Sequence, residues 1–88
     1  MADPAQLKNQ LEAYQEILSS HLARMREEYD TLKDRWASLS DVWEGSAAEE
    51  VRHFWTGAAA DLEAHLEEGE ALATYLAERL EHLQRFAL

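Results

Sequence analysis

Four histidines are the side chains of this sequence best suited to metal binding or proton transfer: His21, His53, His65 and His82. None of them has a second histidine three or four positions away, so no helix face would carry the histidine pair typical of zinc sites. Asp61 and Glu78 lie four positions before His65 and His82. A metal held there would need further ligands from another chain. Such pairs on helices are usually solvated, and we predict no metal and no cofactor.

Adjacent carboxylates occur at Glu27-Glu28, Glu49-Glu50 and Glu67-Glu68. Consecutive residues of a helix point in different directions, so these pairs are not the facing dyad that acid–base catalysis uses. Glu50 and His53 have the Glu-x-x-His spacing of di-iron bundles, but such a site needs a second copy of the motif. The sequence also lacks a glycine-rich phosphate loop and a nucleophile elbow. We therefore expect a protein that is not an enzyme.

The charge of the chain limits its partners. Acidic residues outnumber basic ones 18 to 8, which gives a formal net charge of −10. Nucleic-acid binding relies on lysine and arginine, so a nucleic-acid partner is not expected. An anionic membrane surface would repel the chain, and no stretch approaches eighteen uncharged apolar residues, so we expect no stable membrane insertion. Without cysteine, disulfides and thiolate metal sites are excluded.

The first half of the chain has the pattern of one long helix. The whole chain has 88 residues, a length that predicts a single domain, residues 1–88. From Leu7 to Trp43 a hydrophobic residue recurs every three or four positions, which is the spacing of one stripe on an α-helix. Asp3-Pro4 has the order of an N-cap followed by a first helical residue. The pattern predicts a helix over about 4–41.

Signals for a turn lie at the middle of the chain. Gly45 can adopt a left-handed backbone at the end of a helix without the steric cost of a Cβ atom. Ser46 and Glu49 have the spacing of a capping box, in which each side chain bonds the backbone amide of the other residue. Together they predict a turn over 42–46 and the start of a second helix at about 47.

The second half continues the hydrophobic stripe from Ala48 to Leu83 and predicts a helix over about 47–86. Trp55 falls within the stripe, so we expect it in the core or in an interface. Gly57 lies among alanines, and we interpret it as a packing glycine that allows a close helix contact.

Two helices of equal length joined by a short turn predict an all-α, antiparallel two-helix hairpin. A hairpin has a single helix–helix contact, so a broad hydrophobic stripe would stay partly wet. Pairing of two hairpins into a four-helix bundle would cover it, and we therefore expect a dimer. The residues expected in the core or the dimer contact are Leu18, Met25, Tyr29, Leu32, Trp36, Trp55, Leu62 and Leu66.

The midpoint of the chain also resembles a known family. Trp43-Glu44-Gly45 lies between the two helical halves and is followed by Ser-Ala-Ala, with Trp55 twelve positions after Trp43. The N-terminus lacks the basic and apolar segments of an ordinary secretory signal. In these features and in length the whole chain resembles the WXG-motif family, the early-secreted-antigen-like small substrates of type VII secretion systems.

The resemblance implies a non-enzymatic helical hairpin in which Trp43 and Gly45 build the turn. It implies dimerisation with a second copy or with a sister WXG-motif hairpin, and recognition by a membrane-associated secretion ATPase. It also implies synthesis in a bacterial cytoplasm and secretion without a cleaved signal peptide. Whether the dimer contains one kind of chain or two stays open at this point.

The chain departs from the family at its export signal. Signal-bearing members have Tyr-x-x-x-Asp/Glu near the end of the second helix, whereas here Tyr75 is followed four positions later by Arg79. The resemblance therefore implies a type VII substrate or a co-secreted partner of a signal-bearing chain. The alternative is an intracellular coiled-coil adaptor, or a chaperone that escorts a larger exported toxin.

Overall fold

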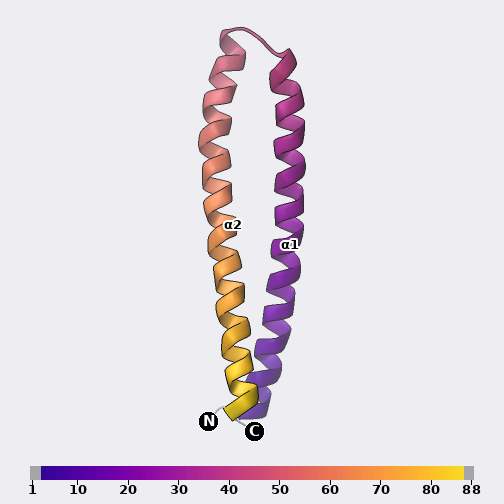
Figure 1. The fold of residues 1–88 in the computed structure, drawn as a ribbon, viewed down its shortest axis with the longest axis vertical. Coiled ribbons are helices and arrows are strands. Elements are labelled where there is room, and N and C mark those ends of the chain that lie inside the picture. The colour runs from indigo at the N-terminus through magenta and orange to yellow at the C-terminus, as the bar shows by residue number, and fades with distance from the viewer. Residues whose placement is uncertain (1–2, 87–88) are drawn as a thin grey trace.

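The computed structural model describes residues 3–86, which fold as two long antiparallel helices (Figure 1). Helix α1 spans Pro4–Val42 and helix α2 spans Ser46–Phe86, and the described part contains no strand. The molecule is a rod with principal extents of 63 × 18 × 17 Å. This confirms the predicted all-α hairpin. The predicted bounds were 4–41 and 47–86, so each helix extends one residue further into the turn.

The beginning of α1 is capped as the sequence indicates. Asp3 has an extended backbone, and its Oδ1 accepts a hydrogen bond from the Ala5 amide at 3.1 Å. Pro4 follows as the first helical residue. An amide at this position has no acceptor within the helix, so the lack of an amide proton in proline costs no hydrogen bond. The carbonyl of Asp3 also accepts from the Leu7 amide at 2.9 Å, which closes the first turn.

Three residues, Trp43, Glu44 and Gly45, connect the helices. Trp43 ends α1 by taking an extended backbone with φ −109° and ψ 121°. Gly45 has φ +108°, a conformation that residues with a Cβ atom rarely adopt. The sequence predicted this freedom for Gly45, and the chain uses it to reverse direction within three residues.

We expect Gly45→Val to lower the free energy of unfolding by about 1–2 kcal/mol, because a β-branched residue is strained at positive φ. Gly57→Val is the matched control, since Gly57 lies within α2 and has open space around it. The control should leave stability unchanged or slightly raised. Equal denaturation midpoints for Gly45→Val and the unchanged chain would contradict the conformational argument.

The predicted capping box does not form, and that prediction is wrong. Ser46 is already the first residue of α2, so the cap position falls on Gly45, whose carbonyl accepts from the Glu49 amide at 3.1 Å. The Glu49 carboxylate turns away and pairs with Arg52 Nη1 at 2.6 Å. A guanidinium one turn along the helix therefore attracts the carboxylate that the capping box would have used.

Arg52 instead completes the turn by capping the end of α1. Its Nε donates to the Ser40 hydroxyl and its Nη2 donates to the Ser40 carbonyl, both at 2.9 Å. Nη2 also donates to the Trp43 carbonyl. The last carbonyls of a helix have no partner within it. Arg52 supplies a charged donor to them from the other helix.

Leu66 and Leu22 are buried between the helices, with 1% and 7% of their surface exposed. Gly69 lies against Leu22: a Cβ atom on Gly69 would be 2.6 Å from Leu22 Cδ2. The missing side chain thus allows the close approach of the helices at this level. Gly57 has nothing within 4 Å of its Cβ position. The prediction that Gly57 packs against the other helix is wrong, because it lies on the outer side of α2.

Aromatic residues fill the part of the seam nearer the turn. The Trp36 and Trp55 rings meet across the helices in a tilted arrangement. Their centroids are 5.6 Å apart, a distance typical of interacting aromatic pairs. Tyr29 is buried, and its hydroxyl donates to the Ala59 carbonyl at 3.1 Å. The Tyr29 hydroxyl therefore has a hydrogen-bond partner within the seam, as a buried tyrosine usually does.

Candidate partner-binding surface

The hydrophobic residues can be sorted by assigning the letters a to g to successive residues, with Leu22 and Leu66 both at a. At about 100° per residue, positions a and e lie side by side on one sector, and c, g and d lie side by side on another. Cross-helix contacts centre on a, with e on one side of it and d on the other: Tyr29, Trp36 and Arg52 are at a, Arg26 and Glu63 are at e, and Trp55 and Gly69 are at d. Each helix therefore turns its a position, flanked by d and e, toward the other.

Every large hydrophobic residue that the described chain leaves exposed is at c, d or g, on both helices. They are Leu7, Tyr14, Ile17, Leu32, Leu39 and Val42 of α1, and Val51, Phe54, Leu62, Leu72 and Tyr75 of α2. We call the c and g positions of both helices, together with the exposed d residues Leu32, Leu39 and Leu62, the open face. Val42 and Phe54 protrude most, with 79% and 71% of their surface exposed. The hairpin thus has one hydrophobic side that its own fold does not cover.

The predicted core residues divide between the seam and the open face. Tyr29 and Leu66 are buried, and Leu18, Met25, Trp36 and Trp55 are half-buried along the seam. In contrast, Leu32 is 52% exposed and Leu62 is 38% exposed. The structure therefore brings six of the eight together in the seam and leaves Leu32 and Leu62 on the open face. Of the turn motif, Trp43 is half-buried and Gly45 is exposed.

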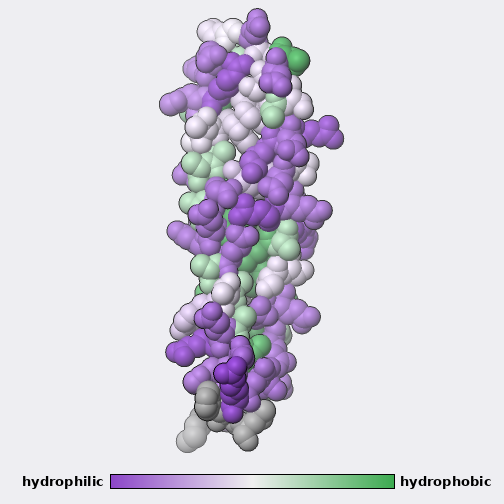
Figure 2. Space-filling view, in the orientation of Figure 1, coloured by the Kyte–Doolittle hydropathy of each residue, from purple (hydrophilic) through white to green (hydrophobic). Residues whose placement is uncertain are grey.

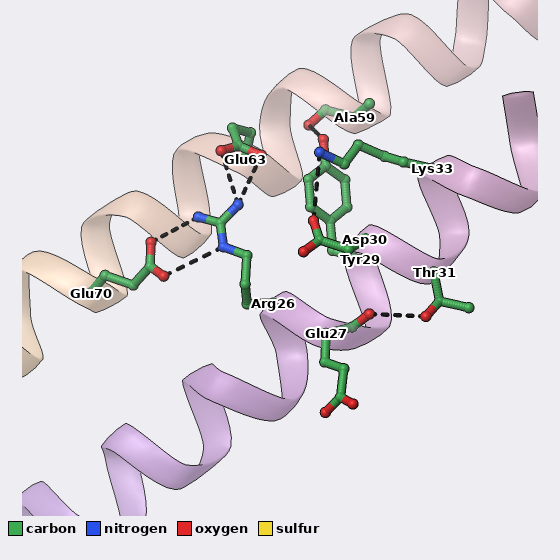
Figure 3. Close-up of polar contacts among 9 residues, drawn as sticks. All are labelled: Arg26, Glu27, Tyr29, Asp30, Thr31, Lys33, Ala59, Glu63 and Glu70. Carbon is green, nitrogen blue, oxygen red and sulfur yellow. Dashed lines mark hydrogen bonds and ion pairs between the residues drawn. The ribbon is translucent and has the colours of Figure 1, made fainter.

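The opposite edge of the seam is polar and closed by cross-helix bonds (Figure 3). Arg26 lies between two carboxylates of α2: its Nη1 is 3.0 Å from Glu63 and its Nη2 is 2.8 Å from Glu70. Nearer the chain ends, Gln84 donates to Glu12 at 3.3 Å. The hydrogen bonds that Arg26 donates to the carboxylates of Glu70 and Glu63 raise the pKa of Arg26 above its ordinary value, with Glu70 as the larger cause, so Arg26 stays charged at any usable pH.

The hairpin exposes more surface than a compact protein of its size. Its accessible area is 6877 Å², whereas a compact monomer of this mass exposes about 5,300 Å². Figure 2 shows one face of the rod, on which hydrophilic side chains predominate and hydrophobic ones appear in a narrow line between the helices. A standard interface covers about 800 Å² on each partner, so the excess is large enough for one.

A groove of about 340 Å³ lies on the open face, towards the end of the rod away from the turn. Its walls are Leu11, Tyr75, Leu76, Arg79, His82 and Leu83, all at positions c, d or g. Arg79 lies along the groove edge, where its Nε donates to the Tyr75 hydroxyl at 3.1 Å and its guanidinium stacks on the Tyr75 ring. The leucines of the groove can contact a hydrophobic side chain of a partner, and Arg79 at its edge can pair with a carboxylate of the same partner.

The residues considered for catalysis or metal binding are dispersed along the rod. Within residues 3–86 there is no group of three or more histidine, aspartate or glutamate side chains placed to hold a metal ion. Over the same residues, neither helix has a segment long and apolar enough to cross a membrane. The feature with the clearest capacity for interaction is the open face.

Comparison with protein-family models, curated proteins and solved structures gives no match for this chain. The family resemblance therefore stays a hypothesis.

Sequence reasoning missed Arg26 and Arg52, the two arginines that bond across the helices. A signal for Arg26 was present: it lies beside the hydrophobic stripe, and Glu63 and Glu70 hold the same position on the other helix, seven residues apart. For Arg52 the signal was weaker. Nothing in the local spacing indicates that a residue six positions into α2 reaches back to Ser40 and Trp43.

Proposed function

We propose that this protein is a non-enzymatic pairing hairpin that a type VII secretion system exports, as a substrate or as a co-secreted partner. The observation that carries the proposal is the open face, because it runs along both helices and a single hairpin leaves it exposed to water. Hydrophobic patches of this extent on soluble proteins usually mark protein–protein contacts. The chain therefore acts by assembly with another helical hairpin.

The turn supports the secretion part of the proposal. Trp43-Glu44-Gly45 forms the whole connection between α1 and α2, at the place where the WXG motif would put it. A membrane-associated secretion ATPase is the proposed receptor. The test is to express the chain in a bacterium with a type VII system and in a strain lacking its ATPase. Export only from the first strain is expected, and equal amounts in both culture filtrates would refute the proposal.

Tyr75 favours the co-secreted role. In a signal-bearing chain the residue four positions after the tyrosine is acidic, whereas here it is Arg79, which holds the tyrosine hydroxyl. We expect export to rise when a signal-bearing sister hairpin is expressed in the same cell. If the chain stays inside the cell in complex with a larger exported toxin, the alternative role of an escorting chaperone replaces this one.

The role of Trp43 can be separated from its contribution to folding. Its side chain is half-buried at the end of α1, so Trp43→Ala should cost about 1–2 kcal/mol, less than the 3–5 kcal/mol typical of a fully buried tryptophan. We expect a folded hairpin that is no longer exported. Circular dichroism melts and the filtrate assay check both parts. Export at the level of the unchanged chain would show that Trp43 is not recognised.

A further inference from the structure

Burial is uneven along the rod. Among residues 3–85, the buried ones all lie between the middle of the rod and the turn, and they are Leu22, Tyr29, Ala48 and Leu66. No residue of 3–21 or 71–85 is buried. We call residues 4–21 of α1 and 71–85 of α2 the arms. The arms form the part of the hairpin away from the turn, and there the two helices cover each other less completely.

The middle of the arms has small or polar residues where the seam nearer the turn has large ones. Its a and e positions are half-buried or exposed, and they hold Gln15, Ser19, Ala73 and Ala77. Together with Thr74, Glu78 and Glu81 these residues line a notch of about 300 Å³ between the helices, on the polar edge of the seam. Hydrophobic stabilisation follows the apolar area removed from water, so alanines beside an open notch contribute little of it.

The polar groups of the notch are bonded within one helix rather than across the seam. Gln15 Nε2 donates to the Ser19 hydroxyl, and the Thr74 hydroxyl donates to the Glu70 carbonyl, both at 3.0 Å. Both bonds survive when the helices separate. The cross-helix bond from Gln84 to Glu12 is exposed and 3.3 Å long, so water can replace it at little cost. Half-buried leucines close the arms, and they are Leu11, Leu18, Leu76, Leu80 and Leu83.

The arms meet the rest of the hairpin at the contact between Leu22 and Gly69. On the turn side of this contact Arg26 bonds Glu63 and Glu70 across the seam, and the buried Tyr29 follows one turn later. Glycine is the poorest helix former after proline, so α2 is weakest at Gly69. The strongly bonded part of the hairpin therefore ends at the point where α2 can most easily bend.

From this pattern we propose that the arms separate as one unit, hinged at the contact of Leu22 with Gly69, while the turn side of the hairpin stays closed. Segments with few buried apolar contacts are the ones that open locally in native proteins. Opening gives a partner access to the seam side of the α2 end, including Leu76 and Leu83, without unfolding the hairpin. The inference goes beyond the proposed function, because it applies whether or not the chain is exported.

Native-state hydrogen exchange of the full chain, resolved by residue, tests this inference. We expect the amides of 8–21 and 73–85 to share one protection factor, on the order of 100-fold below that of 25–36 and 55–66, with a step at Leu22 and Gly69. Simple fraying would instead give protection that rises gradually from the chain ends. The notch lies on the polar edge, so assembly through the open face leaves it unfilled.

A variant that fills the notch, Gln15→Leu/Ser19→Leu, makes the test specific. Burial of two leucine side chains between the helices should slow exchange about tenfold or more in both arms, including the arm of α2, which carries no substitution. The matched control is Gln6→Leu/Ser20→Leu, which makes the same two changes at exposed f positions of α1. The control should leave exchange in the α2 arm unchanged, and both variants should keep their helical circular dichroism spectrum.

Three results would each overturn the inference. The first is protection in the arms equal to that of the turn side, and the second is a gradual rise in protection with no step. The third is slower exchange in α1 alone when the notch is filled, which would mean that leucine acts through helix propensity and not through contact with α2. None of these results bears on the filtrate assay, which decides the export proposal separately.

Discussion

Leu66→Ala is expected to lower the free energy of unfolding by about 3 kcal/mol. Leu66 is 1% exposed, and it is the largest fully buried side chain of the described chain. Removing a buried leucine side chain loses its transfer free energy and leaves a cavity, which together cost about 2–5 kcal/mol. With so few buried residues, little else in the seam can compensate. Most of the stability of a chain this short would be lost.

Urea denaturation followed by circular dichroism measures this loss at a fixed protein concentration. Leu66→Met is the control, since a swap that conserves volume usually costs less than about 1.5 kcal/mol. Both variants keep the open face unchanged, so any difference between them comes from the seam. Similar midpoints for Leu66→Ala and Leu66→Met would show that the helices do not meet at Leu66.

Arg52→Met should cost about 2–3 kcal/mol, because it removes the donors that reach Ser40 and Trp43 at the end of α1. Hydrogen bonds that involve a charged group contribute about 1.5–3 kcal/mol, and the freed carbonyls must find water. Methionine keeps much of the aliphatic part of the side chain, so the change reports mainly on the lost bonds. We expect a lower denaturation midpoint and faster amide exchange in the residues around the turn.

The same substitution elsewhere provides the comparison. Arg85 makes an exposed bond to Glu81 within one helix, with 67% of its side chain accessible. Arg85→Met should therefore change stability by at most about 0.5 kcal/mol. If the two arginine variants melt alike, then Arg52 is not the residue that holds the turn together.

Much of the fold could be predicted because it follows from local signals. Asp3 caps α1 through its own side chain, and Gly45 takes the positive φ that the turn requires. The capping box failed as a prediction because Ser46 entered the helix one residue early and Arg52 competed for Glu49. Arg52 is held in place by Ser40 at the end of α1 while it pairs with Glu49. The position of Ser40 relative to α2 is a property of the folded hairpin, which the spacing of residues around Ser46 does not encode.

The division of the hydrophobic stripe could not be predicted either. Leu32 and Leu22 belong to one band on α1, yet Leu22 is buried against Gly69 and Leu32 is exposed. A band that covers positions a, d and g is wider than one partner helix can cover, and its periodicity does not state which side faces that helix. The contact between Gly69 and Leu22 places the Leu22 side of the band inward, and that contact joins residues far apart in the sequence.

The slenderness of the rod has a consequence for transport. At 63 × 18 × 17 Å the hairpin is less than a third as wide as it is long. The two described ends of the chain lie together at one end of the rod, opposite the turn (Figure 1). If the hairpin is exported as proposed, a pore that admits this cross-section lengthwise would let it pass folded, without separation of its helices.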